Sequence, residues 1–177
     1  MVYRIPAVNL VGRGCLAQLK DEIGTLGCKK ALVVSDKFLT ENGVVEKVTK
    51  VLDQVGIEHT LYNDVKQNPS VANVEGGLEV LKKENCDFIV SIGGGSPQDC
   101  GKAISVLATN GGKITDYEGV NKSQKKCLPI VAIATTAGTS AEVTINYVIT
   151  DEETHIKMIM VDLSLIHISE PTRPISI

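Results

Sequence analysis

The chain has 177 residues, of which 43% are hydrophobic, and a formal charge of −3 at pH 7. This length and apolar content suffice for one domain with a full core. The acidic balance argues against a broad basic surface for nucleic acid or anionic lipid. Only 3% of the residues are aromatic and Trp is absent, so we expect no base-stacking platform and no nucleic-acid partner.

The sequence also gives expectations about location. No apolar run approaches the eighteen or so residues of a membrane helix, and the N-terminus lacks the regions of a signal peptide. We therefore expect a cytoplasmic protein without a membrane partner. The five cysteines are odd in number and form no Cys-x-x-Cys pair, which predicts free, mostly buried thiols.

Strand and helix patterns alternate along most of the chain. Apolar runs predict strands over residues 3–11, 31–35, 56–62, 88–92 and 129–134. Helical spacing predicts helices over 15–26, 42–55 and 69–85, and a fourth that begins at Ser96. Gly76 and Gly77 inside the third helix indicate close packing against that turn. A hairpin over 143–150 and 156–161 follows, joined by residues 151–154.

Strands separated by helices of this length imply right-handed crossovers. The predicted fold class is therefore α/β, a Rossmann-like parallel sheet with helices on both faces, plus a β-hairpin.

Three glycines, Gly93 to Gly95, join the buried strand over 88–92 to the helix after it. We expect Ser96 to cap this helix, Pro97 to take its first position and Asp99 to lie in its first turn. A glycine turn lets a ligand approach the backbone, and the N–H groups of a helix N-terminus favour an anion. The turn predicts a phosphate or pyrophosphate site, with a sharp corner lacking a ligand as the alternative. Its spacing is neither the Rossmann motif nor a P-loop.

Other polar residues also follow predicted strands, at the edge where ligands bind parallel sheets. Asp36 is placed to accept the hydroxyls of an adenosine ribose, or simply to cap the next helix. In the first role it selects NAD over NADP, because like charges near 4 Å cost about 1 to 4 kcal/mol. Asn68 follows another strand on the same side. Thr135, Thr136 and Thr139 suit a ribose or adenine edge, with a plain loop as the alternative.

Two lysines are candidates for charge interactions. Lys157 either brings a cation from the hairpin to the ligand or is solvated. Lys102 has Asp99 as an i, i+3 neighbour with which it can pair. The three histidines, His59, His155 and His167, show no metal-binding spacing, and no Ser lies in a nucleophile elbow. The residues therefore predict a ligand-binding protein and no catalytic residue.

Three motifs in this order carry a family resemblance. They are Gly-Gly-Gly-Ser-Pro-Gln-Asp-Cys-Gly-Lys over 93–102, Asp-Tyr-Glu-Gly over 116–119, and Thr-Thr-Ala-Gly-Thr-Ser-Ala-Glu-Val-Thr over 135–144. From about Pro6 to Asp162 the chain resembles the N-terminal half of an iron-containing (group III) alcohol dehydrogenase. The resemblance is greatest to the lactaldehyde reductase, 1,3-propanediol dehydrogenase and methanol dehydrogenase type.

The resemblance implies an NAD-dependent enzyme that interconverts small primary alcohols or diols with aldehydes, and a homo-oligomer when complete. It also implies a second, all-helical domain that holds a divalent metal, commonly Fe²⁺, where the metal acts as a Lewis acid on the alcohol. The implied coenzyme contacts are Asp36, Asn68, Gly94, Gly95, Ser96, Thr135, Thr136, Thr139, Thr144, Val148 and Lys157. By the same resemblance, Asp99 and Lys102 lie near the nicotinamide or the pyrophosphate.

The metal-binding residues of the family follow the hairpin, and this sequence does not reach them. We expect residues 1–162 to form an NAD-binding domain that is inactive by itself and has no metal ligand. Residues 163–177 fit neither the family continuation nor a helix, which predicts a foreign or disordered tail. The alternatives are a dehydroquinate synthase or glycerol-phosphate dehydrogenase type of enzyme and a non-catalytic nucleotide-binding module.

Overall fold

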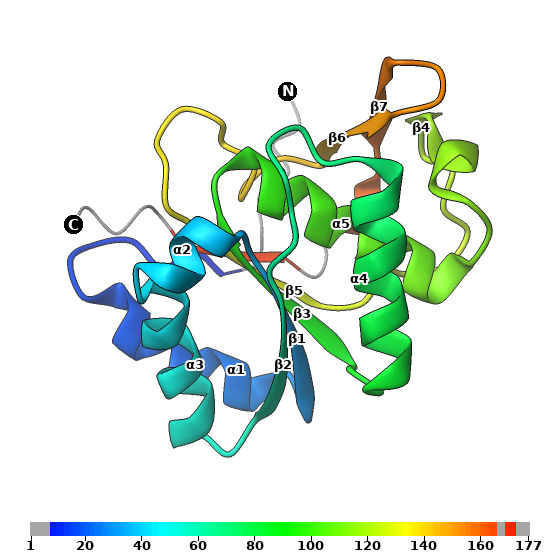
Figure 1. The fold of residues 1–177 in the computed structure, drawn as a ribbon. Coiled ribbons are helices and arrows are strands. Elements are labelled where there is room, and N and C mark those ends of the chain that lie inside the picture. The colour runs from blue at the N-terminus through cyan, green and yellow to red at the C-terminus, as the bar shows by residue number, and fades with distance from the viewer. Residues whose placement is uncertain (1–7, 166–168, 173–177) are drawn as a thin grey trace, which may run out of the picture.

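The computed structural model describes residues 8–165 and 169–172 (Figure 1). The strands are β1 Lys30–Val34, β2 Glu58–Tyr62, β3 Phe88–Gly93, β4 Gly119–Val120, β5 Ile130–Ala134, β6 Asn146–Asp151, β7 Ile156–Val161 and β8 Ser169–Thr172. The α-helices are α1 Leu19–Thr25, α2 Lys37–Glu41, α3 Val44–Gln54, α4 Val71–Lys83 and α5 Gly95–Asn110. Three short 3₁₀ turns complete the list: η1 Cys15–Gln18, η2 Ile114–Tyr117 and η3 Leu163–Leu165.

The main sheet is parallel and has the order β2-β1-β3-β5-β8. Helices α1 and α3 cover one face, and α4 and α5 cover the other (Figure 1). Alternate residues of one strand enter the two cores: Val33 of β1 packs with the first pair of helices and Leu32 with the second. Because both faces are covered, every residue of β3 and β5 is buried. This arrangement confirms the predicted α/β fold.

A second, three-stranded sheet has the order β4-β7-β6. Strands β6 and β7 form the predicted antiparallel hairpin, paired from Asn146 with Val161 to Asp151 with Ile156. Tyr147 and Met160 on one face of the hairpin are buried in the same core as α4 and α5. The hairpin is thereby packed beside α5, at the end of the helix that adjoins the glycine turn (Figure 1).

The two glycines inside α4 mark a close approach, as the sequence predicts. A β-carbon at Gly77 would collide with the side chain of Ile104 and would lie 3.1 Å from the Tyr62 ring. At Gly76 it would lie 3.0 Å from the Tyr62 hydroxyl oxygen. The lost helix propensity of about 1 kcal/mol per glycine is thus offset by tight contact of α4 with β2 and α5.

Some segments differ from the sequence prediction. Helix α2 was not expected, since it has only five residues and buries none of them. Most of the expected opening strand over 3–11 lies outside the described residues, and Leu10 forms an isolated bridge. After Asp162, Leu165 is buried and Ser169–Thr172 pair with β5 as an outer strand. The assignment of residues 163–177 to a foreign or disordered tail stays a prediction, as does the domain boundary at 162.

Candidate functional site

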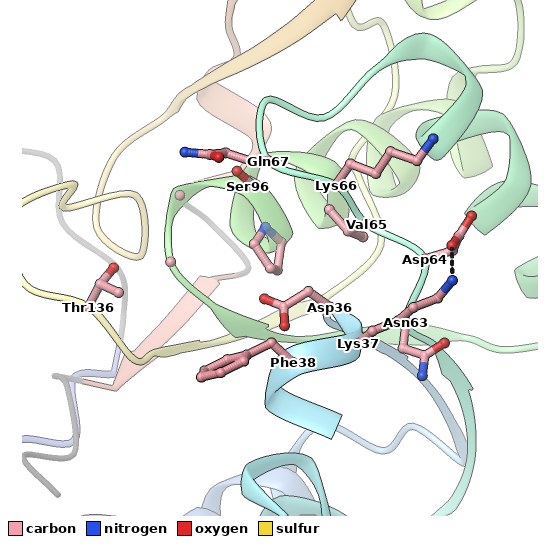
Figure 2. Close-up of a pocket in the computed structure, with 13 residues that line it drawn as sticks. Asp36, Lys37, Phe38, Asn63, Asp64, Val65, Lys66, Gln67, Ser96 and Thr136 are labelled. Carbon is pink, nitrogen blue, oxygen red and sulfur yellow. Dashed lines mark ion pairs between the residues drawn. The ribbon is translucent and has the colours of Figure 1, made fainter. Parts of the chain in front are cut away.

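A cavity of about 570 Å³ opens at the carboxyl ends of β1 and β3 (Figure 2). We call it the main cavity. Its wall combines the segment after β1, the segment after β2, the glycine turn and one threonine from the loop after β5. The lining residues are Asp36, Lys37, Phe38, Asn63, Asp64, Val65, Lys66, Gln67, Gly94, Gly95, Ser96, Pro97 and Thr136. Four chain segments far apart in sequence thus meet at one edge of the sheet, as predicted for Asp36, the glycine turn and Thr136.

The glycine turn is open to this cavity, but its helix begins earlier than the sequence suggested. Gly93 ends β3 with φ 149°, a conformation that side chains disfavour, and Gly94 takes the N-cap position without a side-chain cap. The predicted cap by Ser96 is therefore wrong, and Pro97 is the third helical residue rather than the first. The Ser96 Oγ instead accepts a hydrogen bond from the Asn68 N–H at 3.3 Å.

Starting the helix at Gly95 leaves two donors at the cavity. The first amides of a helix have no partner within it. Pro97 has no N–H, and the Gln98 N–H already bonds to the Gly94 carbonyl at 3.4 Å. The amides of Gly95 and Ser96, both cavity-lining residues, are thus placed to bind an anion.

Asp36 caps a helix, which is one of the two roles that the sequence left open, and it also lines the main cavity. It is the N-cap of α2, where its Oδ1 accepts the Leu39 N–H at 2.8 Å. Figure 2 shows the carboxylate directed into the main cavity, on the side of the glycine turn. Since the cap uses Oδ1, the other oxygen remains as an acceptor for a ligand.

An apolar cavity of about 300 Å³ adjoins the main cavity and shares Asp36, Phe38, Gly94 and Thr136 with it. Its other lining residues are Leu16, Leu39, Val44, Lys47, Val48, Ile133 and Thr135. Thr139 lies across from Gly95, because a β-carbon there would stand 3.5 Å from its methyl group. All three predicted threonines therefore lie beside the glycine turn.

A third cavity of about 190 Å³ lies between the glycine turn and the hairpin, and we call it the hairpin cavity. Asp99 and Val148 line it together, and the Asp99 Oδ2 accepts the Val148 N–H at 3.1 Å. Asn68, also in its wall, accepts a hydrogen bond from the Lys157 Nζ at 2.9 Å. The expected hairpin residues are thus brought to the glycine turn.

Asp99 differs from its predicted place. It is the fifth residue of α5, beyond the first turn, because the helix begins at Gly95. Burial raises the pKa of its carboxyl to about 6, against the opposing effects of the Lys102 charge and the Val148 N–H. A carboxyl group with a pKa of about 6 can gain or lose its proton close to neutral pH.

Lys102 and Thr144 are not among the lining residues of these three cavities. Lys102 is 3% exposed and its Nζ donates to the Asn146 carbonyl at 2.8 Å and to the Thr144 hydroxyl at 3.5 Å. Burial lowers the pKa of Lys102 to about 8, while the charge of Asp99 acts in the opposite direction. Lys102 interacts with Asp99 through its charge, and its hydrogen bonds hold Thr144 and the start of β6 on α5.

Sequence reasoning missed several residues of the main cavity. Phe38, Lys37 and Asp64 line it, as do Lys66 and Gln67. Asn63 and Asp64 directly follow β2, so the rule that singled out Asp36 after β1 applies to them as well. Phe38 is one of only two phenylalanines and is 70% exposed, but exposure cannot be read from the sequence.

Within residues 8–165 and 169–172, no group of three His, Cys, Asp or Glu could hold a metal ion. The described residues therefore offer no site for the iron that the family resemblance assigns to a second domain. No helix among them combines the length and apolar character needed to cross a bilayer. His167 lies outside the described residues.

The comparison with known proteins decides the family. The family described as iron-containing alcohol dehydrogenase matches residues 6–167, most of the chain. The chain belongs to this family. It is 49% identical over 172 residues to alcohol dehydrogenase 4 of Schizosaccharomyces pombe, covering 96% of this chain and 41% of that protein.

Solved structures agree with this assignment. A 1,3-propanediol oxidoreductase superposes with a TM-score of 0.93 at 40% identity, covering 97% of this chain and 45% of the other. The sulfoacetaldehyde reductase of Bifidobacterium kashiwanohense, solved in complex with NAD⁺, has a TM-score of 0.85 at 31% identity, with 97% and 45% coverage. The chain thus spans less than half the length of these relatives.

Proposed function

We propose that this chain is the coenzyme-binding part of an NAD-dependent alcohol dehydrogenase that interconverts small primary alcohols or diols with aldehydes. One observation carries the proposal: the glycine turn, with two helix amides for an anion, and the Asp36 carboxylate lie in one cavity at the carboxyl edge of a parallel sheet. When bound, NAD accepts hydride from an alcohol, and NADH returns it to an aldehyde.

Each wall of the site has a part in this proposal. The amides of Gly95 and Ser96 bind the pyrophosphate beside Gly94, and Asp36 accepts the hydroxyls of the adenosine ribose. Thr135, Thr136 and Thr139 contact the adenosine side. The hairpin cavity takes the nicotinamide half, with Asn68, Asp99, Val148 and Lys157 around it. Lys102 acts as a positioning residue, because it holds Thr144 and Asn146 in place from behind.

Alcohol oxidation itself calls for groups that the described residues do not supply. They contain no candidate metal group, so we derive no step through a metal. We propose that the 177-residue chain binds NAD(H) without oxidising an alcohol. A non-catalytic nucleotide-binding module is the second candidate.

Location and assembly remain part of the proposal. We place the protein in the cytoplasm, as a homo-oligomer when joined to the rest of such an enzyme, without nucleic-acid or membrane partners. The free cysteines of the described chain are compatible with a reducing compartment.

The direct test is a titration of the purified chain with NADH, followed by coenzyme fluorescence. We expect saturable enhancement that ADP-ribose reverses, since ADP-ribose carries the pyrophosphate and the adenosine ribose. No enhancement at millimolar NADH would refute the proposed site. Oxidation of 1,3-propanediol by this chain with NAD⁺ and added Fe²⁺ would refute the claim that it lacks alcohol-oxidising groups.

A further inference from the structure

The main cavity contains an ion pair to which the proposed coenzyme site assigns no role. The Lys37 Nζ lies 3.1 Å from the Asp64 Oδ1, and both residues line the cavity. Lys37 opens α2 directly after Asp36, whereas Asp64 follows β2. The pair therefore joins the corner that holds the proposed ribose contact to the neighbouring strand end.

The ion pair draws the lysine away from its neighbour. In Figure 2 the Asp36 carboxylate points toward the glycine turn. The Lys37 side chain extends the other way and reaches Asp64. A cation that is adjacent in sequence to the proposed ribose contact is thus held at the far end of the cavity. Its charge is matched there by a carboxylate.

The charges around the cavity show the consequence. Two acids, Asp36 and Asp64, and two bases, Lys37 and Lys66, are among its lining residues, so their formal charges cancel. Without the Asp64 charge the same wall would carry a net charge of +1. A ribose 2'-phosphate carries up to two negative charges. Its binding is weakened by repulsion from the acids and strengthened by attraction to a released lysine.

From this geometry we propose that Asp64 is a second determinant of coenzyme choice, because it engages Lys37 and so withholds a cation from the 2'-phosphate of NADP. The proposal rests on the proposed function, since it presupposes that the adenosine ribose lies at Asp36. Asp36 excludes the phosphate by repulsion; Asp64 acts through Lys37. NADH carries no phosphate at this position, so its binding is expected to depend little on the pair.

The pair is easily released. The Lys37 and Asp64 side chains are 68% and 56% exposed, and ion pairs this exposed contribute little to stability. Removing the Asp64 charge therefore frees the lysine with little effect on stability.

The experiment measures dissociation constants of NADH and NADPH for the purified chain and three variants. Asp64→Asn is expected to tighten NADPH binding about five-fold and to change NADH binding less than about two-fold. Asp64→Asn combined with Lys37→Gln is expected to return NADPH affinity to the wild-type value. Glu46→Gln is the matched control, since Glu46 forms an exposed ion pair with Lys50 at 2.7 Å on α3, outside the main cavity.

The outcomes separate the two proposals. Failure of the wild type to bind NADH refutes the proposed function. With NADH bound normally, an unchanged NADPH affinity in Asp64→Asn overturns the role of Asp64. A gain that survives in the double variant, or one that Glu46→Gln reproduces, also overturns it, because the effect would then be general charge repulsion and not release of Lys37.

Discussion

Two cavities of nearly equal volume lie at opposite edges of the same sheet. The main cavity, about 570 Å³, opens at the carboxyl ends of the strands, and another of about 560 Å³ opens at the amino ends of β1 and β2. At the amino edge the polar groups pair with one another. Lys30 bonds to Glu84 at 2.9 Å, and the nearby Asp87 carboxylate accepts the N–H groups of Lys29 and Lys30.

Cavity volume alone therefore does not identify the binding site. At the carboxyl edge, the Gly95 and Ser96 amides and one oxygen of Asp36 remain for a ligand. At the amino edge, Lys30, Glu84 and Asp87 already have partners within the chain. Substitutions at the two edges should therefore have separable effects, on binding at one and on stability at the other.

The largest expected effect is on binding at the carboxyl edge. Gly95→Val places a branched side chain between the glycine turn and Thr139, where a β-carbon has room at 3.5 Å but further atoms occupy the cavity. Loss of an amide contact to phosphate should weaken NADH binding about 30-fold. Fluorescence titration measures it. Glu58→Gln, in the amino-edge cavity, is the control. An equal loss of NADH affinity in that variant would show that substitutions at the two edges do not have separable effects.

Substitution of Asp36 should have a smaller effect on NADH binding and a separate effect on stability. Asp36→Asn keeps an oxygen for the α2 cap but removes the charge, and should weaken NADH binding about ten-fold. Asp36→Ala should show the same loss of binding and lower the free energy of unfolding by about a further 1 kcal/mol, because the cap is gone. Titration and urea unfolding measure the two effects. Unchanged NADH affinity in Asp36→Asn would restrict this residue to capping.

The sequence predicts the fold well because the period of the apolar residues distinguishes strands from helices and glycines mark where these elements end. The strands β1, β3 and β5, the helices α3 and α4, and the hairpin all lie close to their predicted ranges. Residues at the ends of these strands were correctly grouped, since a parallel sheet places all its carboxyl ends at one edge. The coenzyme contacts themselves stay predictions.

The parts that could not be predicted depend on tertiary contacts. Ser96 and Pro97 read as a helix start, yet the φ of Gly93 begins the turn earlier, and backbone geometry decided the outcome. Helical spacing pairs Lys102 with Asp99, but its Nζ donates to the Asn146 carbonyl at the start of β6, a contact between segments far apart in sequence. The Lys37–Asp64 pair joins two strand ends whose adjacency only the sheet order reveals.

A third prediction concerns the amino edge. Asp87→Ala removes a carboxylate that accepts the N–H groups of Lys29 and Lys30 at 2.9 and 3.0 Å. Because these amides are partly exposed to water, the free energy of unfolding should fall by only about 1 kcal/mol. NADH affinity should stay unchanged. Weaker NADH binding by a variant that unfolds normally would show that the two edges are coupled.

The two edges also differ in pH response, which gives the smallest expected effect. At the amino edge, the hydrogen bond and charge of Lys30 lower the pKa of Glu84, so its contribution is present above about pH 4.5 and is lost as pH falls through the lowered value. Beside the glycine turn, burial raises the pKa of Asp99 from 3.8 to about 6. The folded state therefore holds this proton more tightly, and stability declines as pH rises from about 4 to 6.

Asp99→Asn should remove this decline. Its amide oxygen can still accept the Val148 N–H, but it carries no charge to desolvate. Urea unfolding of the wild type and the variant at pH 4.5 and 6.5 measures the difference. The variant should gain stability relative to the wild type at the higher pH. Lys102 in the wild type, with a pKa of about 8, is protonated at both pH values. If the free energies of unfolding of the wild type and the variant differ by the same amount at both pH values, Asp99 does not titrate in this range. Its charged form would then be stabilised in the folded state, as that of Glu84 is.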